Sequence, residues 1–97
     1  MKTITGSTEE ICRALVAAAF SETDWRWVQG QCLFFLTYPD IEVRGLAATC
    51  LGHLARIHQK LDLEVVIPAL KSHLKDKEIF GQVQEALEDI EMYMLCG

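Results

Sequence analysis

Apolar residues recur at intervals of three and four along most of the chain, the spacing that places side chains on one face of an α-helix. The clearest stripe follows Pro39 and contains Val43, Leu46, Ala47, Cys50, Leu51, Leu54 and Ile57. A similar stripe follows Asp76 and contains Ile79, Phe80, Val83, Ala86, Leu87, Ile90 and Met94. Both segments are predicted to be amphipathic helices, the third and the fifth of the chain.

Capping residues mark where the helices begin and end. Ser7, with Glu10 three residues later, is a capping box that opens a first helix reaching about Phe20. The polar residues 21–24 supply caps for a second helix, whose apolar residues are Trp25, Val28, Cys32, Phe35 and Leu36. Pro39 ends this helix, because the residue before a proline leaves the α region.

The segments around Asp40 and Asp62 complete the set of helices. Asp40 is expected to cap the third helix and to pair with Arg44 across its first turn. Asp62 opens a fourth segment, Leu63 to Leu74, in which Pro68 either kinks the helix or marks its true first turn. A strand could be argued only for residues 61–67, and we expect helix there too. The prediction is an all-α fold of about five helices.

The second and third helices align with the fourth and fifth at an offset of 36 residues. The aligned pairs include Asp40 with Asp76, Glu42 with Glu78, Gly45 with Gly81 and Leu51 with Leu87. A helix–turn–helix period in the 30s is typical of an α-solenoid, in which stacked hairpins share a continuous core. We therefore predict a short solenoid of two hairpins plus an N-terminal helix, in a single domain over residues 1–97. The alternative is an up-down helical bundle.

The segment PDIEVRGLAATCLGHLARI resembles the inner helix of a HEAT repeat, of the short type found in phycobilin-lyase-like proteins. The matching residues are Asp40, Val43, Arg44, Ala47, Ala48, Leu51 and Gly52. The segment VIPALKSHLKDKEIFGQVQEALEDI is similar to a second copy, with Phe80 where the arginine belongs. The resemblance covers about Trp25 to Met94, which makes the first helix a half-repeat or a cap. It implies a binding scaffold and no particular activity.

The chain is acidic, with 14 Asp and Glu against nine Lys and Arg among 97 residues and a net charge of -5. A protein that binds phosphates normally carries the opposite bias, so direct binding of nucleic acid is disfavoured. An acidic surface suits a basic protein partner. Glu9, Glu10 and Arg13 interrupt any signal-peptide core, and the apolar run 14–20 is too short to cross a bilayer. We expect a cytoplasmic protein without membrane contact.

In size, acidity and absence of targeting the chain is similar to immunity proteins of contact-dependent and other polymorphic toxin systems of bacteria. That resemblance implies an inhibitor that binds and neutralises a basic toxin domain. The first expectation for this toxin domain is a nuclease. The alternative is a HEAT-type scaffold, adaptor or chaperone for a partner that is not a toxin.

The residues that carry chemistry form no catalytic or metal-binding motif. The four cysteines, Cys12, Cys32, Cys50 and Cys96, lack the close spacing of zinc ligands and lie among apolar residues, where free cysteine behaves as a small hydrophobe. Cys50 and His53 share a helix, but Cys50 belongs to its buried stripe. We expect the protein to have no enzymatic activity and to bind no cofactor and no metal ion.

The candidate binding residues lie away from the apolar stripes, on the concave face of the predicted solenoid. On the third helix they are Glu42, His53 and Arg56, beside Thr49. On and before the fifth helix they are Glu78, Glu85, Glu88, Asp89 and Met92, and Glu10 of the first helix would extend this acidic ridge. Such a ridge could meet cations of a partner. The plainer interpretation is a solvated helix face.

Two further features concern the surface. Trp25 and Trp27 are two residues apart and so roughly opposite on a helix, which leaves one of them a candidate for an exposed binding residue. The run Met92 to Leu95 has no polar face, so the last turn either caps the core or offers an apolar end. We expect a monomer or a weak homodimer through that end.

Overall fold

The computed structural model describes residues 3–95, which form five α-helices. These are α1 (Thr8–Ser21), α2 (Trp25–Phe35), α3 (Ile41–His53), α4 (Leu63–Ser72) and α5 (Phe80–Ile90). Two π-helical segments, η1 (Leu54–His58) and η2 (Glu91–Leu95), continue α3 and α5. No strand occurs within residues 3–95, so the all-α prediction is confirmed.

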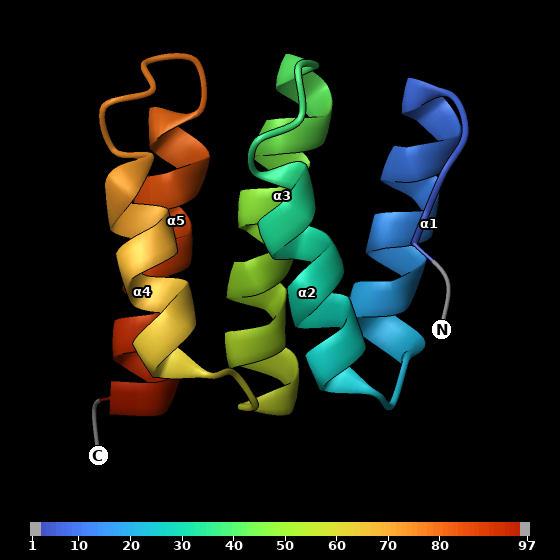
Figure 1. Cartoon of the computed structure of the whole chain (residues 1–97). Coiled ribbons are helices and arrows are strands. Elements are labelled where there is room, and N and C mark those ends of the chain that lie inside the picture. The colour runs from blue at the N-terminus through green and yellow to red at the C-terminus, as the bar shows by residue number, and fades with distance from the viewer. Residues whose placement is uncertain (1–2, 96–97) are drawn as a thin grey trace.

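The helices are arranged in two layers (Figure 1). α1, α3 and α5 lie side by side, with α3 in contact with both of its neighbours. α2 covers α1 and α3, while α4 packs against α5. The α2–α3 and α4–α5 pairs are therefore helical hairpins, and α1 stands in the same layer as the second helix of each hairpin. This is the predicted order of two hairpins and an N-terminal helix.

Three of the predicted N-terminal caps are formed as expected, and one of them is Asp40, which accepts from the backbone N–H groups of Glu42 and Val43. The backbone N–H of Glu10 donates to Ser7 Oγ at 3.2 Å, and the Ser7 N–H donates to Glu10 Oε1 at 3.0 Å, which closes the capping box. The Ser7 donor also lowers the pKa of the Glu10 carboxyl. At α2, Asp24 Oδ1 accepts from the N–H of Trp27 at 3.2 Å. Local sequence thus fixes where α1 and α2 begin.

In the second hairpin, α4 begins at the predicted residue, whereas α5 begins later than predicted. α4 starts at Leu63, so Pro68 lies inside the helix and not in its first turn. Asp62 occupies the cap position but makes no side-chain capping bond. α5 starts at Phe80 and not directly after Asp76, because residues 77–79 form a turn in which Asp76 Oδ1 accepts from the backbone of Glu78 at 3.1 Å.

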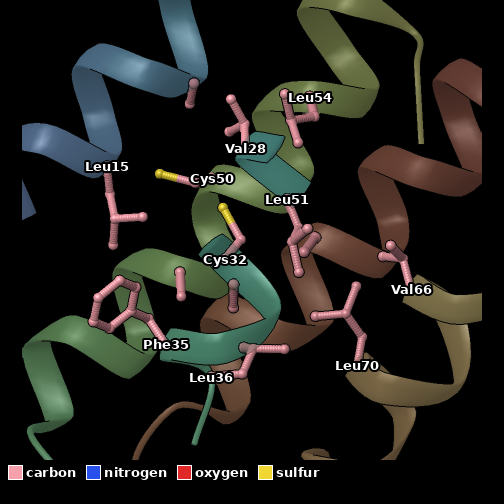
Figure 2. Packing of buried hydrophobic residues seen from close by; sticks show 14 of the residues in the cluster. Leu15, Val28, Cys32, Phe35, Leu36, Cys50, Leu51, Leu54, Val66 and Leu70 are labelled. Atoms are coloured by element: carbon pink, nitrogen blue, oxygen red, sulfur yellow. The ribbon is translucent and has the colours of Figure 1, made fainter. Parts of the chain in front are cut away.

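The core lies between the two layers and runs through all five helices. Figure 2 shows its centre, where Cys32 of α2 and Cys50 of α3 lie among buried leucines and valines. A hydrogen bond with Cys50, together with burial, raises the pKa of the Cys32 thiol well above its ordinary value. These two cysteines act as small apolar residues, as predicted; Cys12 is half-buried, and Cys96 lies outside the described residues.

Two buried glutamines of α2 were not predicted to be in the interior. Gln29 Oε1 accepts from the backbone N–H of Asp62 at 2.7 Å, and Gln31 Oε1 accepts from the N–H of Ile4 at 2.7 Å. Each side chain therefore ties down a segment distant in sequence, the start of α4 in one case and the N-terminal segment in the other. These hydrogen bonds offset the free-energy cost of burying the two side-chain amides.

Candidate protein-binding face

The repeat extends to α1, as hydrogen bonds in the turns before α3 and α5 show. Asp40 Oδ2 accepts from the Thr8 hydroxyl at 3.1 Å, and Asp76 Oδ2 accepts from Arg44 Nε at 3.2 Å. Positions 40 and 76 are 36 apart, and so are positions 8 and 44. α1 is thus related to α3 as α3 is related to α5. Of the two predicted roles for the first helix, the structure supports the half-repeat.

Arg44 does not pair with Asp40, so that prediction was wrong. The Asp40 carboxylate accepts hydrogen bonds from the Thr8 hydroxyl and from two backbone N–H groups at the start of α3. Arg44 instead bonds Asp76 and Glu78, both at 3.2 Å, and donates to two carbonyl oxygens of the α2–α3 turn at 2.9 and 3.1 Å. The arginine therefore links the two hairpins.

The second helices of the hairpins and α1 present a common surface on the side away from α2 and α4, which we call the three-helix face. By helical spacing and exposure, its members from α1 are Glu9, Arg13, Val16, Ala17 and Phe20; from α3 and η1 Glu42, Leu46, Thr49, His53 and Arg56; and from α5 and η2 Gln82, Glu85, Asp89 and Met92. Most of the predicted site residues lie on this face.

A cluster of partnered side chains crosses the three-helix face near the C-terminal ends of α1, α3 and α5. Arg56 Nη1 lies 3.5 Å from Asp89 Oδ2, and the Arg56 guanidinium also contacts His53 Nδ1. The His53 ring packs against Phe20, with 5.0 Å between ring centroids. Burial and the neighbouring Arg56 charge lower the pKa of His53, which favours the neutral imidazole. Three predicted binding residues are thus held together by one another.

The predicted acidic ridge divides into paired and unpaired carboxylates. Asp89 is paired with Arg56, and Glu78 with Arg44. Glu42, Glu85 and Glu88 are exposed and form no ion pair within residues 3–95. Glu10 is engaged in its capping box. The carboxylates available to a partner are therefore fewer than the sequence indicates, and the paired ones serve the structure itself.

The two tryptophans lie on α2, in the layer opposite the three-helix face. Both are half-buried, because their opposite directions bring each onto a flank of the helix. Trp25 is covered by the Arg26 guanidinium at 4.6 Å from its ring, and Trp27 packs against the core. Neither candidate tryptophan is among the exposed residues; the exposed aromatic of α2 is Phe34. The structure does not bring the tryptophans together with the acidic residues.

The last described turn caps the core only in part. Met94 packs against the core, whereas Met92 and Leu95 are exposed. The capping prediction therefore holds for one methionine, and the other apolar side chains of this run remain open to solvent.

An open hollow of about 550 Å³ lies in the three-helix face between α1 and α3. Its lining is Glu9, Cys12, Arg13, Val16, Ala17 and Leu46. Sequence reasoning missed this feature, because it placed Leu46 in the core stripe and did not align the first helix with the third. The available signal was the offset of 36, which aligns Glu9 and Val16 with Gly45 and Gly52.

Burial limits the Cys50–His53 pair that was considered from the sequence. The Cys50 side chain is completely buried (Figure 2), so the Cys50–His53 pair has no accessible thiol. Within residues 3–95, no three His, Cys, Asp or Glu side chains are grouped to hold a metal ion. None of the helices in this range is long and apolar enough to span a bilayer.

Taken together, residues 3–95 form a small all-α protein of two helical layers with a mixed acidic and apolar face. Among solved structures it is similar to a chain of the crystal structure of a CDI complex from Cupriavidus taiwanensis LMG 19424. The TM-score is 0.84 and the identity 30%, over 92% of this chain and 80% of that chain. The protein belongs to the same family as that component of the CDI complex. No family model and no curated protein matches, so the HEAT assignment stays a prediction.

Proposed function

We propose that this protein is the immunity protein of a contact-dependent inhibition (CDI) system, which binds a toxin domain in the cytoplasm and neutralises it by occlusion. The observation that carries the proposal is the relation to a component of a CDI complex, at 30% identity and a TM-score of 0.84. The completely buried Cys50 disfavours catalysis by the Cys50–His53 pair.

We further propose that the toxin domain is basic and acts as a nuclease. A nuclease needs cationic side chains to hold the phosphate backbone of its substrate. A net charge of -5, with Glu42 and Glu85 unpaired on the three-helix face, complements such a surface. Complementary charge also speeds association and makes it sensitive to salt. An inhibitor that covers the cationic surface would exclude the nucleic acid.

The direct test is rescue of growth. The cognate toxin domain of the proposed CDI system is expressed in a bacterial host, with and without this protein, and colony counts are compared. Rescue together with a purified complex supports the proposed function. If the two proteins neither form a complex nor restore growth, the immunity assignment is wrong and the adaptor alternative takes its place.

Reversal of one unpaired charge on the face is expected to weaken the complex. We expect Glu85→Lys to raise the dissociation constant about tenfold and to reduce the dependence of binding on salt, because a cation then faces the cationic partner. Titration calorimetry at two salt concentrations measures both quantities.

Glu64→Lys is the matched control for this measurement. Glu64 is exposed on α4, in the other layer, and its reversal changes the net charge by the same amount. Equal effects of the two substitutions would mean that only the total charge matters, and the three-helix face would lose its role.

A further inference from the structure

The seam between α1 and α3 is open where the equivalent seam between α3 and α5 is closed. At Gly52 a Cβ atom would lie 3.2 Å from Cα of Ala86, and at Gly45 it would lie 3.0 Å from Gln82 Nε2. These two glycines therefore allow α5 to pack closely against α3. The equivalent positions of α1, 36 residues earlier, carry Glu9 and Val16, and both line the hollow. The hollow thus follows from two side chains at positions where the next repeat has glycine.

The interior of the hollow is apolar. Its walls include the side chains of Val16, Ala17 and Leu46 with the half-buried thiol of Cys12. A volume of about 550 Å³ has room for a large aliphatic or aromatic side chain. Val16 is 37% exposed, so apolar surface there is in contact with water in the free protein and is available for burial by a partner.

The surroundings of the hollow are predominantly negative. Burial raises the pKa of the Cys12 thiol, and the nearby carboxylates of Glu42 and Asp40 raise it further. Glu9 adds a third carboxylate, and Arg13 is the cation in the lining. Arg13 is paired with Glu9 in an exposed ion pair, which contributes little and exchanges readily with a competing charge. The field around the apolar floor therefore favours cations.

We propose that the hollow between α1 and α3 is the anchor site for the toxin domain, receiving an apolar side chain that stands next to a lysine or arginine. The apolar side chain fills the space lined by Val16 and Leu46, and the neighbouring cation meets Glu42 or Glu9. A central apolar anchor with charged contacts around it is the arrangement from which interfaces draw most of their affinity. This inference rests on the proposed function, of which it specifies the contact.

The first test places a charge at the entrance of the hollow. Val16→Lys is expected to weaken binding of the purified toxin domain at least tenfold, because the lysine repels the incoming cation and occupies the apolar space. Val65→Lys is the matched control, since Val65 is an exposed valine on α4 in the other layer. The Val65→Lys variant should bind the toxin domain with the affinity of the wild type. Thermal unfolding of both variants shows whether the fold is kept.

The second test needs no substitution. Cys32 and Cys50 are completely buried, so Cys12 is the accessible thiol among residues 3–95. N-ethylmaleimide labelling, resolved by peptide mass spectrometry to separate Cys12 from Cys96, should slow at Cys12 at least tenfold when the toxin domain is bound.

The outcomes of these tests distinguish failure of the anchor site from failure of the proposed function. If the wild-type protein does not bind the toxin domain, the proposed function fails and the anchor site with it. If the complex forms but Val16→Lys binds like Val65→Lys, or Cys12 labels equally fast in the complex, the anchor site is wrong and the immunity function stands. Protection of Cys12 that rises with protein concentration in the absence of toxin would assign the hollow to a second copy of this chain and overturn the proposal.

Discussion

Replacing Gly52 by valine is expected to lower the free energy of unfolding by about 2–3 kcal/mol, the range of a strongly overpacked interior. The first added carbon would lie 2.9 Å from Asp89 Oδ2 and 3.2 Å from Cα of Ala86. The carboxylate can rotate away, although its pairing with Arg56 is then lost. The Ala86 backbone cannot rotate away, so α5 must move from α3. The midpoint of urea unfolding measures the loss.

Gly30→Val provides the control for the same substitution. Gly30 lies inside α2, is exposed, and has no atom within 4 Å of the position of an added Cβ. Valine is a somewhat better helix former than glycine, so stability should stay equal or rise by up to about 0.5 kcal/mol. Comparable losses in the two variants would show that valine is unfavourable in any of these helices, and that close packing of α3 on α5 is not the cause.

Gly52 also shows which features of the fold could be predicted from the sequence alone. Spacing of apolar residues and capping signals predicted the helices and their order, because those features depend on neighbours within one turn. The offset of 36 predicted the hairpin repeat, and Gly52 was singled out only through the resemblance of its segment to a HEAT inner helix. The reason for Gly52 is its contact with Ala86, 34 residues away, and only the packed structure supplies that.

The candidate site was predictable to a smaller extent. Positions such as Glu42 and Glu85 could be placed on one surface from helical spacing, and the structure leaves both of them unpaired and exposed. Which carboxylates are neutralised could not be predicted, since Asp89 finds its partner on η1 and Glu78 finds Arg44 on α3. The hollow depends on the seam between two helices, and periodicity within one helix carries no information about a seam.

Arg44→Gln is expected to lower the free energy of unfolding by about 2–3 kcal/mol, the loss typical of removing one partner of a partly buried, charge-assisted network. The Arg44 side chain is 14% exposed and Asp76 24%, so water screens their attraction only partly. Without the guanidinium, Asp76 and Glu78 lose their common cation, and two carbonyl oxygens of the α2–α3 turn lose a donor. Urea unfolding measures the change.

Arg13→Gln is the matched control, because it removes the same charge from an exposed pair. Arg13 and Glu9 are 73% and 78% exposed, and such pairs contribute between zero and about 1 kcal/mol. The double variant of Arg44→Gln with Asp76→Asn separates the loss of pairing from general damage. If the two residues stabilise the fold through their pairing, the double variant loses less free energy of unfolding than the two single variants together. Full additivity, or a loss no larger than that of Arg13→Gln, would mean that Arg44 does not hold the two hairpins together and that packing of the shared core joins α3 to α5.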